Sequence, residues 1–194
     1  WANSLFEDNA EFGLGIKLAT DKKREMAIRL LKELREEVGT ELADAILNNN
    51  ESNETEIIQQ RRNVNDLKRR LKDIRKENSW RLYQVAGFLE KKSMWIVGGD
   101  GWAYDIGFGG LDHVLSTGEN VNILVMDTEV YSNTGGQKSK ASPLGASAKF
   151  AVKGKTTGKK DLAMQAIAHG GAYVAQIAMG AKYVHTLKSN LEAE

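Results

Sequence analysis

Cysteine is absent from this chain of 194 residues, and proline occurs once, as Pro143. Without cysteine, the chain by itself forms no disulfide and holds no iron–sulfur cluster through thiolates. No apolar run approaches the roughly 20 residues that a membrane-spanning helix needs, so we expect no membrane segment. Basic and acidic residues nearly balance, and the net charge of +1 gives no general electrostatic footprint for nucleic acid.

The N-terminus lacks two further features. Residues 1–8 have neither the basic region nor the apolar region of a signal peptide, so we expect a cytoplasmic location. The first residue is Trp1 and not an initiator methionine, which indicates a piece cut from a longer polypeptide. The remaining composition, 41% apolar and 27% charged, is ordinary for a globular protein.

Composition changes sharply near residue 93 and divides the chain. Residues 21–92 are rich in lysine, arginine, glutamate and leucine and contain few glycines. Residues 93–194 hold most of the glycines and several strand-like apolar runs. We therefore expect an α/β domain over 93–194, incomplete at its C-terminus, with residues 1–20 as its N-terminal segment. Residues 21–92 are expected to form a helical appendage.

Apolar residues recur at helical spacing through the appendage. The pattern starts after a predicted N-cap at Thr20–Asp21, stops at Gly39, and resumes as a heptad-like pattern from Ile57 to Ile74. A polar turn over 48–53 separates the two helical stretches. These patterns predict a helical hairpin that packs on itself or on a neighbour. A structural appendage is the simpler interpretation, and a partner-docking arm is the alternative.

The second part of the chain alternates between strand and helix patterns. Continuous apolar strands with intervening helices are typical of a mostly parallel sheet flanked by helices. A long segment over 128–160 has little periodicity, and such a loop in a compact domain is usually functional or disordered. The predicted strands are 94–98, 121–127 and 173–178, and the predicted helices are 105–117, 161–169 and 181–194.

Two of the predicted strands lead directly into polar turns. The first is followed by Gly99, Asp100 and Gly101, and the second by Asp127 and Thr128. Ligands of open α/β sheets bind beyond the carboxyl ends of the strands, so we expect both turns at one edge of the sheet. Glycine in such a turn lets backbone N–H groups come close to an anion.

The two turns also offer oxygen ligands for Mg²⁺. This ion prefers octahedral oxygen coordination from one or two protein side chains together with phosphate oxygens and water. Asp100 offers a carboxylate, Thr128 a hydroxyl and Val130 a backbone carbonyl, and Asn133 can hydrogen-bond phosphate or substrate oxygens. The residues therefore point to a magnesium-bound diphosphate, with thiamine diphosphate as the leading hypothesis.

Longer motifs around these turns resemble a known family. Gly99-Asp100-Gly101 followed by a polar pair is similar to the thiamine diphosphate motif, although Asp127-Thr128 stand where Asn-Asn is usual. The whole pattern resembles pyruvate:ferredoxin (flavodoxin) oxidoreductase, and the resemblance implies the pyrophosphate-binding half of a thiamine diphosphate-binding fold. The stretches that carry it are 1–13, 99–107, 111–115, 127–137, 149–150 and 158–164.

The resemblance implies an enzyme that oxidatively decarboxylates pyruvate to acetyl-CoA and CO₂. Coenzyme A is then a substrate, and electrons pass through iron–sulfur clusters to ferredoxin or flavodoxin. Since this chain has no cysteine, those clusters belong to the parent enzyme only. We expect the parent to be a homodimer, and we expect this chain to perform no turnover alone.

The resemblance also implies roles for individual residues. Asp100, Thr128 and the carbonyl of Val130 would hold Mg²⁺, and Asn133 would also act as a catalytic residue at the reacting centre. The residues expected to bind the cofactor are Gly99, Asp100, Gly101, Trp102, Thr128, Glu129, Val130, Tyr131, Ser132, Asn133 and, against the cofactor ring, Phe6.

Two other functions stay open at the level of the sequence. One is a different thiamine-dependent 2-oxoacid decarboxylase or synthase, against which Asp127-Thr128 counts. The other is a non-catalytic helical adaptor with a degenerate nucleotide-like domain. The lysines at 153, 155, 159 and 160 are expected on a solvated surface, with docking of an acidic redox partner or of coenzyme A phosphates as the alternative. Glu129 is interpreted either as an acid–base group or as the partner of a lysine.

Overall fold

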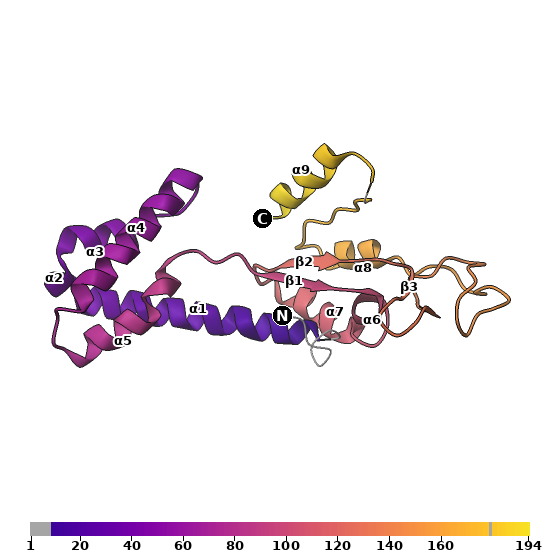
Figure 1. The fold of residues 1–194 in the computed structure, drawn as a ribbon, viewed down its shortest axis with the longest axis horizontal. Coiled ribbons are helices and arrows are strands. Elements are labelled where there is room, and N and C mark those ends of the chain that lie inside the picture. The colour runs from indigo at the N-terminus through magenta and orange to yellow at the C-terminus, as the bar shows by residue number, and fades with distance from the viewer. Residues whose placement is uncertain (1–8, 179) are drawn as a thin grey trace. The chain divides into compact units, whose positions relative to one another are not determined.

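The computed structural model describes residues 9–178 and 180–194, and the chain separates into two compact units. One unit consists of residues 16–92, and the other combines residues 1–15 with residues 93–194. Phe6, which the sequence places against a cofactor ring, lies outside the described residues. Figure 1 labels helices and strands of both units.

The unit of residues 16–92 is helical. Its polar turn over 48–53 lies outside any helix, as expected, and Gly39 separates α2 from α3. The predicted heptad pattern corresponds to α4, although that helix ends at Leu71 and leaves Ile74 beyond its end. The elements are α1 (Ala10–Glu33) from residue 16 onward, α2 (Arg35–Val38), α3 (Thr40–Leu47), α4 (Glu54–Leu71), α5 (Glu77–Val85) and the short 3₁₀ helix η1 (Ala86–Leu89).

Helix α1 begins at Ala10, so the predicted helix start at Thr20–Asp21 is wrong. Two glycines, Gly13 and Gly15, weaken the helical signal of the sequence before residue 20. Packing overrides this weak propensity, because Ala10 and Leu14 are buried in the core of the α/β unit. A Cβ atom at Gly13 would lie 2.6 Å from Ile96 Cγ1, so glycine is what lets the helix approach this closely.

An apolar core fills the helical unit, and the polar side chain of Gln60 is buried with it. Gln60 is 1% exposed, and its Nε2 donates hydrogen bonds to the carbonyls of Ile46 (3.2 Å) and Leu89 (3.0 Å). These bonds connect α4 to the end of α3 and to η1. The buried apolar residues are Ala27, Leu30, Leu31, Leu34, Val38, Leu42, Ala43, Ile46, Val64, Leu67, Leu71, Leu82, Ala86 and Leu89.

A parallel pair of strands organises the second unit. β1 (Trp95–Gly98) pairs with β2 (Asn122–Val125) in the register Ile96 to Ile123, which confirms a parallel sheet between two predicted strands. Figure 1 shows this pair beside α6 (Asp100–Tyr104) and α7 (Phe108–Thr117), and residues of both helices share a core with Ile96. The remaining elements are β3 (Val130–Tyr131), β4 (Gln137–Lys138), α8 (Leu162–Ala168) and α9 (Tyr183–Ala193).

The segment 173–178, predicted as a third strand, forms no strand. A strand needs a neighbour for its backbone hydrogen bonds, and in the described residues this segment has no ladder partner. Most of it is exposed, and Tyr173 and Ile177 are among the exposed large apolar side chains. The opposite faces of β1 also differ, since Ile96 is buried while Val97 is 54% exposed. The sheet is therefore smaller and more open than the sequence predicts.

None of the helices in the described ranges combines the length and the apolar character that crossing a membrane requires.

Candidate cofactor site

Asp100 connects the ends of the two parallel strands. It follows Gly99 directly after β1, and its side chain is buried. Its Oδ1 accepts a hydrogen bond from the backbone N–H of Thr128 (3.0 Å), at the turn that follows β2. Its Oδ2 accepts a hydrogen bond from Ser139 Oγ (3.1 Å). The two polar turns predicted at one sheet edge are thus joined through this one carboxylate.

Burial raises the pKa of Asp100 above its ordinary value, although the hydrogen bonds from Thr128 and Ser139 oppose that shift. A buried carboxylate of this kind is stabilised in its charged form by a nearby cation. Asp100 is therefore electrostatically suited to a metal ion. Within the part of the chain that the structure describes, each of its oxygens accepts one hydrogen bond, so lone pairs remain for coordination.

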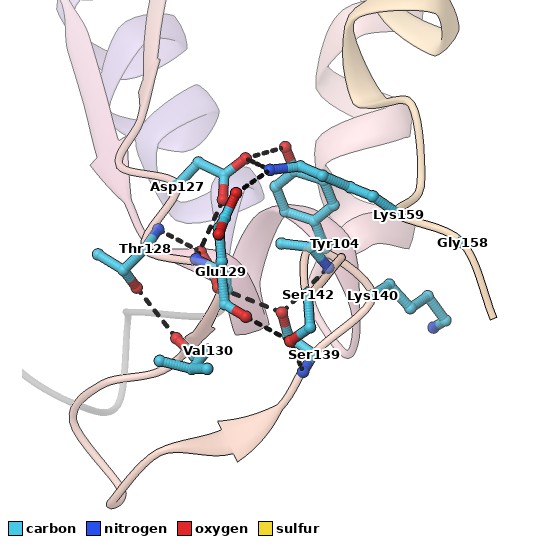
Figure 2. Close-up of polar contacts among 12 residues, drawn as sticks. Tyr104, Asp127, Thr128, Glu129, Val130, Ser139, Lys140, Ser142, Gly158 and Lys159 are labelled. Carbon is cyan, nitrogen blue, oxygen red and sulfur yellow. Dashed lines mark hydrogen bonds and ion pairs between the residues drawn. The ribbon is translucent and has the colours of Figure 1, made fainter. Parts of the chain in front are cut away.

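A short loop after β2 brings further oxygen atoms together. Thr128 Oγ1 lies 3.0 Å from the carbonyl oxygen of Val130 and 2.7 Å from Ser132 Oγ. Magnesium–oxygen bonds are about 2.0–2.1 Å long, so neighbouring ligands of an octahedral site lie about 2.9 Å apart. The Thr128 hydroxyl and the Val130 carbonyl therefore have the separation of two adjacent ligands on one ion. Figure 2 shows both groups on the same turn.

A second polar network surrounds this loop. Tyr104 donates a hydrogen bond from its hydroxyl to Asp127 Oδ2 (2.7 Å), and Lys159 Nζ lies 2.6 Å from the same oxygen. Lys159 also reaches Glu129 Oε1 (3.4 Å). Figure 2 shows the phenol and the ammonium converging on Asp127. Burial and the bond to Asp127 raise the pKa of Tyr104, so this phenol stays a proton donor.

The long segment 128–160 is organised by a buried lysine. Lys155 is 7% exposed, which corrects the expectation that it belongs to a solvated basic surface. Its Nζ donates to the carbonyls of Ser142 (2.6 Å), Gly158 (3.2 Å) and Lys140 (3.3 Å). Three donors thus meet three acceptors, which satisfies the ammonium group. Lys153, in contrast, is exposed as expected.

The other predicted binding residues differ in their position and exposure. Gly99 and Gly101 flank Asp100 at the start of α6. Trp102 is 2% exposed, and its ring packs so closely on Gly98 that a Cβ atom there would lie 2.5 Å from it. Its side chain is therefore part of the core and is not available to line a ligand. Tyr131 is half-buried, and Asn133 is exposed on the loop that follows it.

Several polar groups at this edge were not predicted from the sequence. Ser139 and Ser142 carry no motif, yet Ser139 bonds to Asp100 and Ser142 Oγ donates to the carbonyl of Glu129. Tyr104 was read as part of a family motif without a role of its own. The alternative reading of Glu129, as the partner of a lysine, agrees with its ion pair to Lys159. A sequence signal for these contacts is missing because they span 13 to 39 positions along the chain.

Similarity to known proteins bears on what this edge binds. Residues 83–194 match the family described as "Thiamine pyrophosphate enzyme, C-terminal TPP binding domain". The chain is 59% identical to a pyruvate-flavodoxin oxidoreductase of Trichormus variabilis and 51% identical to a probable pyruvate-flavodoxin oxidoreductase of Escherichia coli. It is 47% identical to a pyruvate:ferredoxin oxidoreductase of Moorella thermoacetica. Each match covers the whole of this chain but only 17%, 16% and 17% of the respective relative.

Proposed function

Because this chain belongs to the thiamine pyrophosphate enzyme family, as part of its C-terminal TPP binding domain, we propose that it is the cofactor-binding part of a pyruvate-oxidising enzyme. The parent enzyme converts pyruvate and coenzyme A to acetyl-CoA and CO₂ and passes electrons to flavodoxin or ferredoxin. The names of relatives that match this chain over its full length support this choice. They favour it over another 2-oxoacid enzyme and over a non-catalytic adaptor.

The main support for the proposal is the contact that Asp100 makes between the ends of the two parallel strands. This buried carboxylate joins the ends of β1 and β2, where Thr128 Oγ1 and the Val130 carbonyl lie 3.0 Å apart. We propose that these three oxygens hold Mg²⁺, which in turn holds the diphosphate of thiamine diphosphate. The donor set, with one carboxylate and two uncharged oxygens, leaves positions for phosphate oxygens and water.

The residues around the metal ligands have separate tasks in this proposal. Gly99 and Gly101 leave backbone groups accessible to the diphosphate, while Ser132 and Asn133 offer hydrogen bonds from the loop. The exposed amide of Asn133 orients the substrate by hydrogen bonding its carboxylate or carbonyl oxygen. When bound, thiamine diphosphate supplies the carbanion stabilisation that decarboxylation of a 2-oxoacid requires.

Other parts of the parent complete the reaction in this proposal. The chain spans 16–17% of the length of the relatives that it matches and contains no cysteine. Iron–sulfur clusters, the coenzyme A site and the electron-carrier docking site are therefore assigned to other segments of the parent. We also propose a cytoplasmic homodimer, a structural role for residues 21–92, and no turnover by this chain alone.

Viologen reduction by the intact parent polypeptide, purified without oxygen, tests the activity. We expect reduction to require pyruvate, coenzyme A, thiamine diphosphate and Mg²⁺ together. Decarboxylation without electron transfer would indicate a different 2-oxoacid enzyme. The absence of any reaction with a 2-oxoacid would overturn the proposal in favour of the adaptor.

A variant of Asp100 tests the metal assignment directly. Asp100→Asn keeps the size of the side chain and removes its charge, so Mg²⁺-dependent binding of thiamine diphosphate should be lost, as measured by calorimetry. Asp112→Asn is the matched control, because this aspartate lies on α7 and its side chain is 52% exposed. An unchanged cofactor affinity in Asp100→Asn would exclude Asp100 as a metal ligand.

A further inference from the structure

Glu129 adopts an unusual backbone conformation between two of the proposed metal ligands. Its φ of 66° lies in the left-handed region, which residues other than glycine rarely adopt. Since Thr128 precedes it and Val130 follows it, this turn determines how the Thr128 hydroxyl and the Val130 carbonyl face each other. A conformation of this kind persists only when its surroundings hold it.

Three contacts hold the turn. The backbone N–H of Glu129 donates to Asp127 Oδ1 (3.1 Å), and Ser142 Oγ donates to the Glu129 carbonyl. The third contact comes from Lys159, which bridges Asp127 Oδ2 (2.6 Å) and Glu129 Oε1 (3.4 Å). Lys159 thus connects the residues on either side of Thr128, as Figure 2 shows.

Without a compensating positive charge, the carboxylates around this turn would repel an anionic ligand. Asp127 and Glu129 place two carboxylates beside Thr128, and Asp100 adds a third through its bond to the Thr128 N–H. A diphosphate that approached three uncompensated carboxylates would be repelled, even with one divalent ion present. Burial lowers the pKa of Lys159, but the two carboxylates outweigh that effect and raise it overall, so the ammonium stays charged.

Lys159 can compensate the charge of these carboxylates but cannot bind the metal itself. An ammonium group carries three donors and no acceptor, so it cannot ligate a cation. Its side chain is 35% exposed and lies with its Nζ 5.9 Å from the centre of the Tyr104 ring, whose hydroxyl bonds the same Asp127 oxygen. Asp127 Oδ2 is thus bound by two donors, the Tyr104 hydroxyl and the Lys159 ammonium.

We propose that Lys159 is a positioning residue of the cofactor site. It compensates one of the two negative charges that flank Thr128 and holds the left-handed turn at Glu129. The Thr128 hydroxyl and the Val130 carbonyl can then meet one metal ion, and the loop can admit a diphosphate. This inference rests on the proposed cofactor function of the same edge of the sheet.

Cofactor binding by the intact parent polypeptide tests the inference. Thiamine diphosphate would be titrated by calorimetry at a series of Mg²⁺ concentrations in the unmodified protein, Lys159→Met, Lys159→Arg and the control Lys153→Met. Loss of a charge-assisted hydrogen bond predicts an affinity about tenfold weaker, or more, for Lys159→Met. Lys159→Arg should retain most of the affinity because it keeps the charge, and Lys153→Met should match the unmodified protein because this lysine is exposed.

A second pair of variants separates charge compensation from general support of the fold. In Asp127→Asn one of the two carboxylates is neutral, so adding Lys159→Met should weaken binding less than it does in the unmodified background. If Lys159→Met alone does not fold, a loss well below tenfold between Asp127→Asn and the double variant supports charge compensation, and a loss of tenfold or more overturns it. An equal loss in both backgrounds would overturn charge compensation.

The outcomes also separate this inference from the proposed function. If the unmodified parent binds no thiamine diphosphate with Mg²⁺, the proposed function fails and the inference fails with it. If the unmodified parent binds the cofactor and Lys159→Met binds it equally well, only the role of Lys159 is overturned. Weaker binding in Lys159→Met with recovery in the double variant supports both.

Discussion

Alanine at Gly13 and alanine at Gly15 should have opposite effects on stability. Both glycines lie in the first turns of α1, so the same chemical change is made twice in one helix. A Cβ atom at Gly13 would lie 2.6 Å from Ile96 Cγ1 and 2.7 Å from Ile96 Cδ1. A Cβ atom at Gly15 would meet no atom within 4 Å among the described residues, apart from its chain neighbours and the backbone of its own helix. The pair therefore separates helix propensity from packing.

The magnitudes follow from two opposing effects. Alanine is favoured over glycine inside a helix by about 1 kcal/mol, and this gain applies at both positions. Overpacking a tight contact costs about 1–3 kcal/mol, and this cost applies only at Gly13. The Ile96 side chain cannot turn away cheaply, because Ile96 is itself buried in β1. We expect Gly15→Ala to stabilise by up to about 1 kcal/mol and Gly13→Ala to destabilise by up to about 2 kcal/mol.

Hydrogen exchange of the intact parent, read by mass spectrometry on peptides from α1 and β1, measures both effects locally. Gly13→Ala should speed exchange in peptides from both elements, whereas Gly15→Ala should slow exchange in α1 alone. Equal protection in the two variants would refute the close packing of α1 on Ile96. Hydrogen exchange reports each segment separately, so the comparison does not require the whole chain to unfold in one transition. A chain of two units need not unfold in that way.

Three further predictions concern buried polar groups and one exposed ion pair. Gln60→Met leaves two buried carbonyls without their donor, at a cost of about 1–3 kcal/mol each. Hydrogen exchange in peptides from α4 should therefore be faster, and an unchanged rate would contradict the bonding role of Gln60. Lys155→Met removes three carbonyl contacts and should speed exchange over 140–158, whereas Lys153→Met should leave it unchanged. A hydrogen bond from Lys76 lowers the pKa of Glu37. At pH values above the ordinary glutamate pKa this ion pair therefore stabilises the fold, and the stabilisation is lost as the pH falls through the lowered pKa. A pH titration followed by NMR should give Glu37 a lower pKa in the unmodified protein than in Lys76→Met. Equal pKa values in the two proteins would argue against the ion pair.

The sheet edge was predictable because each of its signals is local. Apolar runs identify β1 and β2, and the polar turns after them contain Asp100 and Thr128. Parallel pairing then brings the two turns together without further information, as the bond from the Thr128 N–H to Asp100 demonstrates. The assignment of individual residues to Mg²⁺ and to the diphosphate stays a prediction.

What the sequence did not predict depends on distant partners. The start of α1 was missed because packing against Ile96 outweighs the low helix propensity of Gly13. The segment 173–178 has the composition of a strand, but its backbone finds no neighbouring strand in the described residues. Lys155 looks like a surface lysine, and only the folded loop supplies the three carbonyls that allow its burial.

The contacts that assemble the sheet edge also bear on the order in which the chain folds. The bonds between Thr128 and Asp100, Ser139 and Asp100, and Lys160 and the Tyr104 carbonyl close loops of 28, 39 and 56 residues. Loop closure costs entropy before any contact compensates for it, so regions of high contact order form slowly. Many contacts in the helical unit, in contrast, join residues within a helix or in adjacent helices. A nascent chain therefore acquires its helices early and this sheet edge late, so binding of any ligand at the edge would report completed folding.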